Sequence, residues 1–173
     1  MSEGKTAILK NGSKVRIRGY TSDDKEGMVK MYASLSPQSL RWSMPPYNRQ
    51  RIDRWTSDLE NNIILLAIDE GQVVGHLQIS IAVNPRFRGT GELFIYVHQD
   101  FQNVGLGKAL MREGISLARK RGLHRIELSV VADNDAGVYL YEKVGFQKEG
   151  TKRENYLGED GRYHDEFVMG ILL

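Results

Sequence analysis

The chain of 173 residues contains no cysteine. This absence excludes a disulfide framework, a thiolate metal site and a covalent acyl-cysteine intermediate. No apolar run is long enough to span a membrane, and the polar start from Met1 to Lys5 lacks the apolar core of a signal peptide. We therefore expect a cytoplasmic protein that has no membrane partner.

Neither sign of charge dominates, because 24 Lys and Arg residues face 22 Asp and Glu residues and the formal net charge is +2. That charge is too small to indicate binding to nucleic acid or to an anionic membrane. The basic cluster Arg119–Arg121 falls at the end of a predicted helix and precedes Gly122, a typical C-cap arrangement. The 4 histidines show no i,i+4 pair and no neighbouring ligands, so we predict no metal site.

The chain is long enough for one hydrophobic core, and no internal repeat is visible, so we predict a single domain over residues 1–173. Alternating patterns predict strands at residues 15–18, 63–68, 73–82, 91–97, 124–130, 146–156 and 163–172. Helical patterns follow at residues 21–32, 51–59, 106–121 and 134–144, and residues 38–48 are typical of an irregular turn. The order of these elements indicates a mixed α/β fold.

A glycine-rich loop joins the strand at 91–97 to the helix that follows it. Residues 102–107 read Gln-Asn-Val-Gly-Leu-Gly, and Lys108 adds a cation in the first turn of the helix. Gly105 and Gly107 allow turns that a Cβ would hinder, so that backbone N–H groups and the helix dipole converge on an anion. The loop is thus a candidate phosphate site.

Two familiar phosphate loops do not fit this sequence. A Rossmann fingerprint requires glycine or alanine where Leu110 stands. A P-loop requires serine or threonine at Ala109, to hold magnesium, and glycine at Gln102. A nucleoside triphosphate is therefore disfavoured as the ligand.

The loop Gln102–Gly107 and the block Asn134–Phe146 together resemble the GNAT superfamily of acyl-CoA-dependent N-acetyltransferases. The block reads Asn-Asp-Ala-Gly-Val-Tyr-Leu-Tyr-Glu-Lys-Val-Gly-Phe and is similar to the family pattern Asn-x-x-Ala-x-x-Leu-Tyr-x-Lys-x-Gly-Phe, with Gly137 where alanine is usual. Residues 73–77 and the tail 160–169 extend the resemblance over essentially the whole chain. The tail looks like that of the bacterial small-molecule and amino-acid branches.

The resemblance implies the GNAT fold, a mostly antiparallel sheet of about seven strands, splayed in the middle and flanked by about four helices. It implies acetyl-CoA as co-substrate and no metal. The pyrophosphate of CoA would lie on Gln102, Asn103, Val104, Gly105, Leu106, Gly107 and Lys108, and its pantetheine arm on Asn134, Gly137 and Tyr141. Dimerisation is common among GNAT proteins, which leaves a homodimer open, although nothing in this sequence identifies an interface.

Acetylation of an amine requires a base, a stabilised oxyanion and a proton for the leaving thiolate. By family position Glu92 is the candidate base, and burial beside Leu93 would raise its pKa; the alternative is a solvated residue at a strand edge. Tyr141 is the candidate acid near the CoA sulfur, and a backbone N–H of Tyr96 or Val97 would hold the oxyanion. Without cysteine, the amine attacks the thioester directly while both substrates are bound.

Three functions follow from these features. The first is acetyl transfer to a primary amine of a small molecule such as an amino acid or a polyamine. The second is protein N-terminal or lysine acetylation, because residues 34–41 resemble a segment of bacterial protein-lysine acetyltransferases. The third is a non-catalytic acyl-CoA sensor, which would need neither Glu92 nor Tyr141. A pocket closed by Trp42, Tyr47 and the final hairpin would favour the small amine, and an open groove a peptide.

Overall fold

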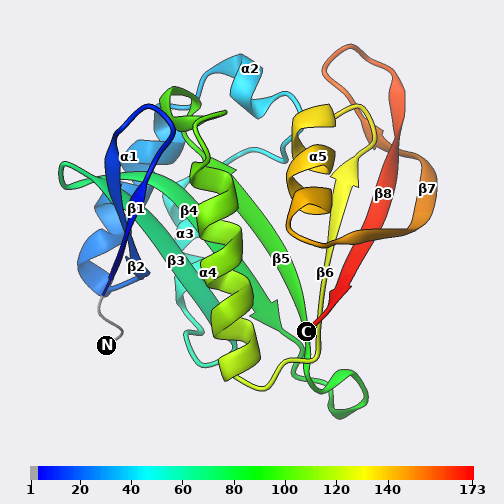
Figure 1. The fold of residues 1–173 in the computed structure, drawn as a ribbon. Coiled ribbons are helices and arrows are strands. Elements are labelled where there is room, and N and C mark those ends of the chain that lie inside the picture. Colours follow the sequence, from blue (N-terminus) through cyan, green and yellow to red (C-terminus); the bar gives the residue numbers. More distant parts are fainter. Residues whose placement is uncertain (1–3) are drawn as a thin grey trace.

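The computed structural model describes residues 4–173, which form one twisted sheet with helices on both faces (Figure 1). The sheet order is β1-β2-β3-β4-β5-β6-β8-β7, and every pair is antiparallel except β5 with β6. The strands are β1 (Lys5–Ile8), β2 (Lys14–Gly19), β3 (Asn62–Asp69), β4 (Gln72–Ile81), β5 (Thr90–Val97), β6 (Arg125–Val131), β7 (Gln147–Leu157) and β8 (Tyr163–Leu172). The helices are α1 (Lys25–Ala33), α2 (Pro37–Leu40), α3 (Arg49–Thr56), α4 (Leu106–Lys120) and α5 (Asp135–Lys143).

The predicted mixed α/β fold with a mostly antiparallel sheet is confirmed, and the described chain holds eight strands and five α-helices. Two short elements account for the difference from the expected counts. β1 has four largely exposed residues at the sheet edge, so its sequence shows no alternation. α2 is one turn within the segment expected to be irregular; Ser36 caps it, accepting a hydrogen bond from the Ser39 N–H at 3.2 Å, and Pro37 occupies its first turn.

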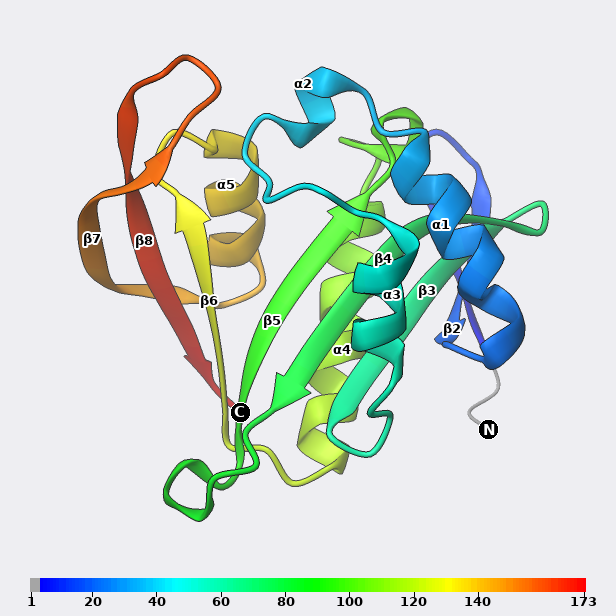
Figure 2. The ribbon, with the colours of Figure 1, turned by 180° about the vertical axis from the view of Figure 1, so that it is seen from behind.

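Helices cover both faces of the central strands, as the opposite views of Figures 1 and 2 show. α4 and α5 lie on one face, and α1 and α3 lie on the other. Because β3 and β4 are buried on both sides, they read as nearly continuous apolar runs rather than alternating ones. No helix within residues 4–173 is long and apolar enough to cross a membrane.

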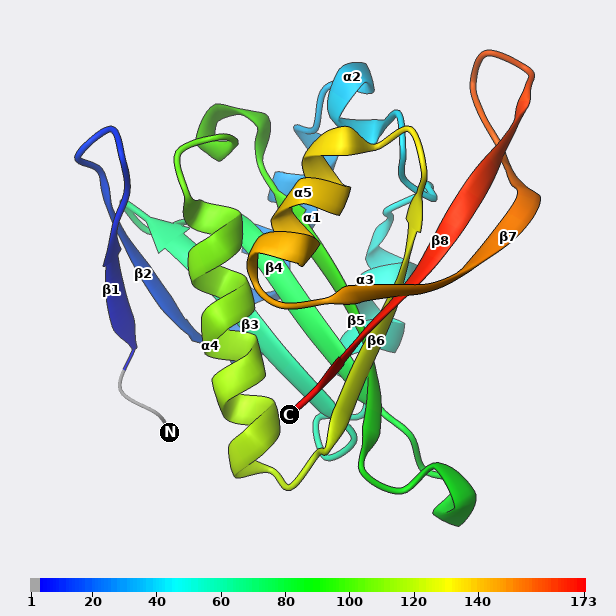
Figure 3. The ribbon, with the colours of Figure 1, turned by 45° about the vertical axis from the view of Figure 1, so that its right-hand side comes forward.

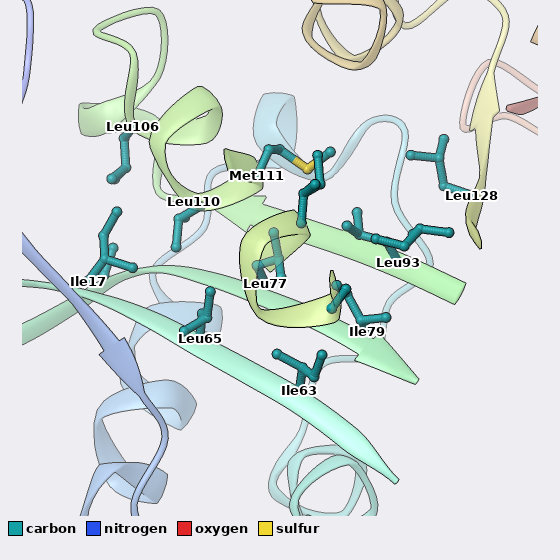
Figure 4. Packing of buried hydrophobic residues seen from close by; sticks show 14 of the residues in the cluster. Ile17, Ile63, Leu65, Leu77, Ile79, Leu93, Leu106, Leu110, Met111 and Leu128 are labelled. Carbon is teal, nitrogen blue, oxygen red and sulfur yellow. The ribbon is translucent and has the colours of Figure 1, made fainter. Parts of the chain in front are cut away.

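The larger core lies between α4 and the sheet (Figure 4). Leu106, Leu110 and Met111 are fully buried there against Leu77 and its neighbours. The approach is close because Gly75 has no side chain: a Cβ at that position would lie 2.9 Å from Leu110 Cδ1. This packing fixes the start of α4 relative to β4 and β5.

The sheet opens between β5 and β6, as Figure 2 shows. The two strands pair only at Thr90 with Arg125, Gly91 with Ile126 and Glu92 with Glu127. Beyond Glu92, β5 continues to pair with β4 while β6 pairs with β8. The second half of β5 therefore presents an unpaired edge to the opening.

Candidate active site

A cleft of about 1050 Å³ runs through the opening between β5 and β6. The glycine-rich loop, the start of α4 and one face of α5 line one end, which we call the coenzyme end. Residues of α3, β4, β7 and the segment 38–47 line the other, which we call the acceptor end. Lys10, Lys108 and Lys143 are on the coenzyme end, whereas the carboxylates Glu92 and Glu166 line the remainder.

The glycine-rich loop has the backbone geometry that its sequence predicts. Gly105 is the N-cap of α4 and has φ 96°, a left-handed conformation that favours glycine, and Asn103 also has a positive φ of 60°. The first N–H groups of α4 have no partner within the helix and, with the helix dipole, favour an anion. Gly107 allows α5 to approach, because a Cβ there would lie 3.0 Å from Leu140 Cδ2.

The predicted loop residues divide into two groups. Gln102, Asn103, Gly105, Gly107 and Lys108 line the cleft. The side chains of Val104 and Leu106 pack into the core instead and anchor the loop. Gln102 also has a structural contact, because its Nε2 donates a hydrogen bond to the Val97 carbonyl at 3.0 Å and ties the loop to the end of β5.

Sequence reasoning missed Lys10, which lines the cleft. It belongs to the turn between β1 and β2, the hairpin beside the start of α4 in Figure 3. Its N–H donates to the Val104 carbonyl at 2.9 Å, and its Cγ lies 4.0 Å from the Cβ position of Gly105. Leu9 next to it is buried in the main core, which fixes the hairpin. Nothing in the local sequence relates this lysine to a loop almost a hundred residues away.

The unpaired edge of β5 offers backbone groups to the cleft. His98 N–H donates to the Val74 carbonyl and Ala82 N–H to the Thr90 carbonyl, so the even-numbered residues of β5 point their hydrogen-bonding groups at β4. Tyr96 N–H is therefore directed at β4. The odd-numbered residues, Val97 among them, direct their N–H groups into the opening, where a ligand amide can pair with them.

α5 brings the second predicted block to the same cleft. Asn134 caps the helix, its Oδ1 accepting a hydrogen bond from the Gly137 N–H at 3.1 Å, and both residues line the cleft. Tyr141 also lines it, and burial raises the pKa of its phenol to about 12, so the hydroxyl keeps its proton at neutral pH. Tyr139 also borders the cleft, but its side chain is 61% exposed.

Glu92 also lines the cleft, on the strand face that carries Phe94 and Tyr96. Of the two alternatives for Glu92, the solvated side chain agrees with the structure, because Glu92 is exposed while Leu93 faces the core on the other side of β5. The alternation of a strand explains the difference, since neighbouring residues point to opposite faces. Within residues 4–173 no cluster of His, Cys, Asp or Glu is arranged to hold a metal ion.

A comparison of the sequence with protein families agrees with the site described above, in which the glycine-rich loop, the opening between β5 and β6 and the block 134–146 meet. The model of the acetyltransferase (GNAT) family matches residues 28–146. The chain belongs to this family.

Individual relatives differ in what they acetylate. The chain is 38% identical over 106 residues to the L-amino acid N-acetyltransferase AaaT of Escherichia coli (strain K12), covering 61% of this chain and 65% of that protein. It is 39% identical over 77 residues to the ribosomal protein bS18-alanine N-acetyltransferase of the same strain, covering 44% of this chain and 51% of that protein. The chain thus spans 65% or less of the length of these two relatives.

A solved structure matches over nearly the whole chain. The acetyltransferase of GNAT family from Streptococcus pneumoniae is 29% identical, with a TM-score of 0.78, and the match covers 92% of this chain and 99% of that one. The GNAT fold therefore extends well beyond residues 28–146.

The acceptor end of this GNAT protein has aromatic walls. Tyr47 and Tyr96 lie edge to face with ring centroids 5.2 Å apart, and Trp55 lies 4.8 Å from Phe94. Fully buried His76 lies behind them, with its Nδ1 2.8 Å from the Tyr32 hydroxyl, and burial lowers the pKa of this imidazole to about 3. His76 is therefore neutral at physiological pH.

A bridge crosses the acceptor end between the segment 41–47 and the β7–β8 hairpin, which approach each other in Figure 2. The Tyr156 hydroxyl is 2.8 Å from the Ser43 carbonyl and 3.1 Å from the Arg41 carbonyl, to which it donates. The Trp42 ring packs edge-on against His164, with centroids 5.1 Å apart. Two segments far apart in sequence thus meet at the cleft, which Trp42, Ser43 and Tyr156 line.

His164 ties the hairpin to the coenzyme end. Its Nδ1 lies 2.6 Å from Asp133 and its Nε2 3.1 Å from Asp160. Hydrogen bonds to Asp160 and Asp133 raise the pKa of His164, because the imidazolium can donate to both carboxylates at once. Asp133 directly precedes Asn134, so the same contact supports the cap of α5.

Proposed function

We propose that this chain is an acetyl-CoA-dependent N-acetyltransferase that acts on a primary amine of a small molecule. Family membership and the coenzyme end support the use of acetyl-CoA, because loop, helix terminus and lysines suit the phosphates of CoA. The relative that acetylates L-amino acids supports an amino acid as the acceptor. The amine attacks the thioester directly with both substrates bound, since the chain has no cysteine to carry the acetyl group.

The candidate residues divide the proton transfers between the two ends of the cleft. Glu92, directly or through a water, takes a proton from the ammonium group of the acceptor, which leaves a nucleophilic amine. The Val97 N–H, directed into the opening, donates to the oxyanion that forms when the amine adds to the thioester carbonyl. As the carbon–sulfur bond breaks, Tyr141 gives its proton to the leaving thiolate. The second proton of the nitrogen then returns to the Tyr141 phenolate, directly or through water, which leaves a neutral amide, a free thiol and a reprotonated tyrosine.

The bridge across the acceptor end is the observation that carries the choice of a small acceptor. Tyr156, Ser43 and Trp42 line the acceptor end and join the two segments that border it, which reduces the room for an extended peptide. A small molecule can enter such a site and be surrounded by Trp55, Phe94 and Tyr96. A peptide would first have to break the contacts of the bridge.

Two other functions remain candidates. The relative that acetylates ribosomal protein bS18 favours a protein acceptor, which the bridge opposes. A sensor that binds acyl-CoA without transferring the acyl group would keep the coenzyme end alone. Glu92 and Tyr141 both line the cleft of this chain, which favours an enzyme over a sensor.

The test measures thiol release from acetyl-CoA by the purified protein with amino acids, polyamines, aminoglycosides and peptides with free N-termini or lysines. Release with a class of small amines is the expected result. Release with peptides alone would contradict the small acceptor. CoA binding by calorimetry, without release from any of these amines, would support the sensor instead.

A further inference from the structure

We propose that the acceptor carries a carboxylate next to its amine and that Arg54, together with Arg51, binds this carboxylate. The proposal rests on the function proposed above and makes it more specific. It selects free α-amino acids among the small amines. Polyamines and protein N-termini, which have no carboxylate at that position, are excluded.

The proposed site is a recess of about 330 Å³ that adjoins the acceptor end. Its lining residues are Arg51, Arg54, Trp55, Asn62, Gln78 and Ser80, so it lies between α3 and the strands β3 and β4. Arg51, Trp55, Gln78 and Ser80 also line the large cleft. A molecule in the acceptor end can therefore extend one of its groups into the recess.

The recess is positively charged. Arg51 and Arg54 are one helical turn apart on α3, so their side chains project to neighbouring positions. No acidic residue lines the recess, and the nearest acids in the sequence have other contacts: Asp53 pairs with Lys25 at 2.8 Å, and Asp58 accepts a hydrogen bond from the Asn61 side chain at 2.9 Å. Two guanidinium groups without a carboxylate favour an anionic ligand.

Arg51 is held in place before any ligand arrives. Its Nη1 donates to the Met44 carbonyl and to the Pro46 carbonyl, and its guanidinium lies 5.0 Å from the centre of the Tyr47 ring and 5.4 Å from that of Trp55. Little side-chain entropy remains to be lost when such a group binds a carboxylate. Arg54 is exposed and forms no ion pair within residues 4–173, so it is free to complete the site.

The recess is adjacent to Glu92, the candidate base. Ser80 of the recess is directly opposite Glu92 in the β4–β5 ladder, and Gln78 is opposite Phe94. Paired strands are about 5 Å apart. An acceptor with its carboxylate in the recess therefore has its amine on the Glu92 side, an arrangement that matches the adjacent charged groups of an α-amino acid.

Gln78 forms the floor between the two spaces. Its Nε2 donates to Asn62 Oδ1 at 2.7 Å, and its Oε1 is buried without a hydrogen-bond partner among the described residues. A buried acceptor without a donor is unfavourable. Because this oxygen has no contact with solvent, Gln78 shapes the wall shared by the two spaces and does not itself bind the ligand.

The experiment compares three sets of acceptors in the thiol-release assay: L-amino acids, the amides of the same amino acids, and the amines that lack the carboxylate. For the wild type we expect kcat/KM to be at least about tenfold higher for the free acids. Arg54→Gln should raise KM for the acids by about tenfold, with little change for amides and amines. Arg51→Gln should also raise KM for the acids. It is the second choice of variant, because Arg51 also holds the segment 44–46 and its loss would disturb that segment.

Arg49→Gln is the matched control, because Arg49 is on the same helix but pairs with Glu26 at 2.6 Å, away from the recess. The control should leave the preference for acids unchanged. An equal loss for acids, amides and amines in Arg54→Gln, or a wild type without preference for acids, would overturn the proposal.

Calorimetry with CoA-loaded protein separates this proposal from the proposed function. Binding of L-amino acids that Arg54→Gln weakens, without thiol release from any acceptor, would support the carboxylate site and contradict the acetyltransferase function. Thiol release with amines and amides as readily as with acids would support the acetyltransferase function and contradict the carboxylate site. Neither binding nor release with amino acids would contradict the carboxylate site.

Discussion

Replacing Tyr141 with phenylalanine removes one hydroxyl from the coenzyme end of the cleft and leaves the ring in place. The ring packs 6.1 Å from Phe146, and the hydroxyl has no hydrogen-bond partner within residues 4–173, so the fold should be unaffected. Burial raises the pKa of the phenol to about 12, so it is protonated throughout the working pH range. It can therefore donate to a leaving thiolate whenever the substrate is bound.

The expected decrease in kcat follows from how much a general acid contributes to the rate. A positioned acid contributes about a hundredfold to ten-thousandfold to the rate, which corresponds to roughly 3 to 5 kcal/mol of barrier. Tyr141→Phe should therefore lower kcat by that factor. Affinity for acetyl-CoA should change by less than about threefold, because the loop and the lysines that hold the phosphates are untouched.

Thiol release measures kcat, and calorimetry measures the Kd for acetyl-CoA. Tyr163→Phe is the matched control: Tyr163 is 64% exposed and is not among the residues that line the cleft, so loss of its hydroxyl should leave both constants unchanged. An unchanged kcat in Tyr141→Phe would refute the role of Tyr141 as the acid. A parallel loss of acetyl-CoA affinity would show that the hydroxyl binds rather than reacts.

Three further changes test other parts of the site. Glu92→Gln should lower kcat by about a hundredfold or more and remove the rise of the rate with pH, and an unaltered pH profile would exclude Glu92 as the base. Lys10→Ala should raise the Kd for CoA by roughly fivefold at low salt, whereas the control Lys14→Ala on the same hairpin should leave this Kd unchanged. If calorimetry gives the same Kd for both variants, Lys10 does not contact a phosphate. Because its carboxylate partners raise the pKa of His164, their contribution to stability is fully present below the unfolded histidine pKa of about 6.5 and is lost as pH rises through the higher folded value. The thermal midpoint of the wild type should therefore fall towards that of His164→Gln as pH increases above neutrality, and a constant difference between the two would contradict the charged contact with Asp160.

The coenzyme end could be predicted from the sequence because its chemistry is local. A glycine-rich turn at the start of a helix directs N–H groups outward whatever the rest of the fold does, and the spacing of Asn134, Gly137 and Tyr141 on one helix brings them to a common face. The long periodic elements were predicted for the same reason. The exposed edge strand Lys5–Ile8 was missed, because four residues without a buried face carry no periodic signal.

The acceptor end could not be predicted in this way. Tyr156 meets the Ser43 carbonyl, and Lys10 meets the glycine-rich loop, only because the sheet brings distant segments together. The exposure of Glu92 likewise depends on which helices cover that face of the sheet and on where β6 diverges from β5.

What the sequence determined by itself is therefore the order of elements, the glycine-rich turn before α4 and the helix that carries Tyr141. The tertiary structure decided the shape and charge of the space that receives the acceptor. The physical reason is that backbone conformation and helix capping depend on neighbouring residues, whereas a cleft is formed by side chains whose proximity is set by packing of the whole sheet. Arg54 and Gln78 show this directly, since only the folding of α3 against the sheet brings an ordinary surface arginine and a strand glutamine into one recess.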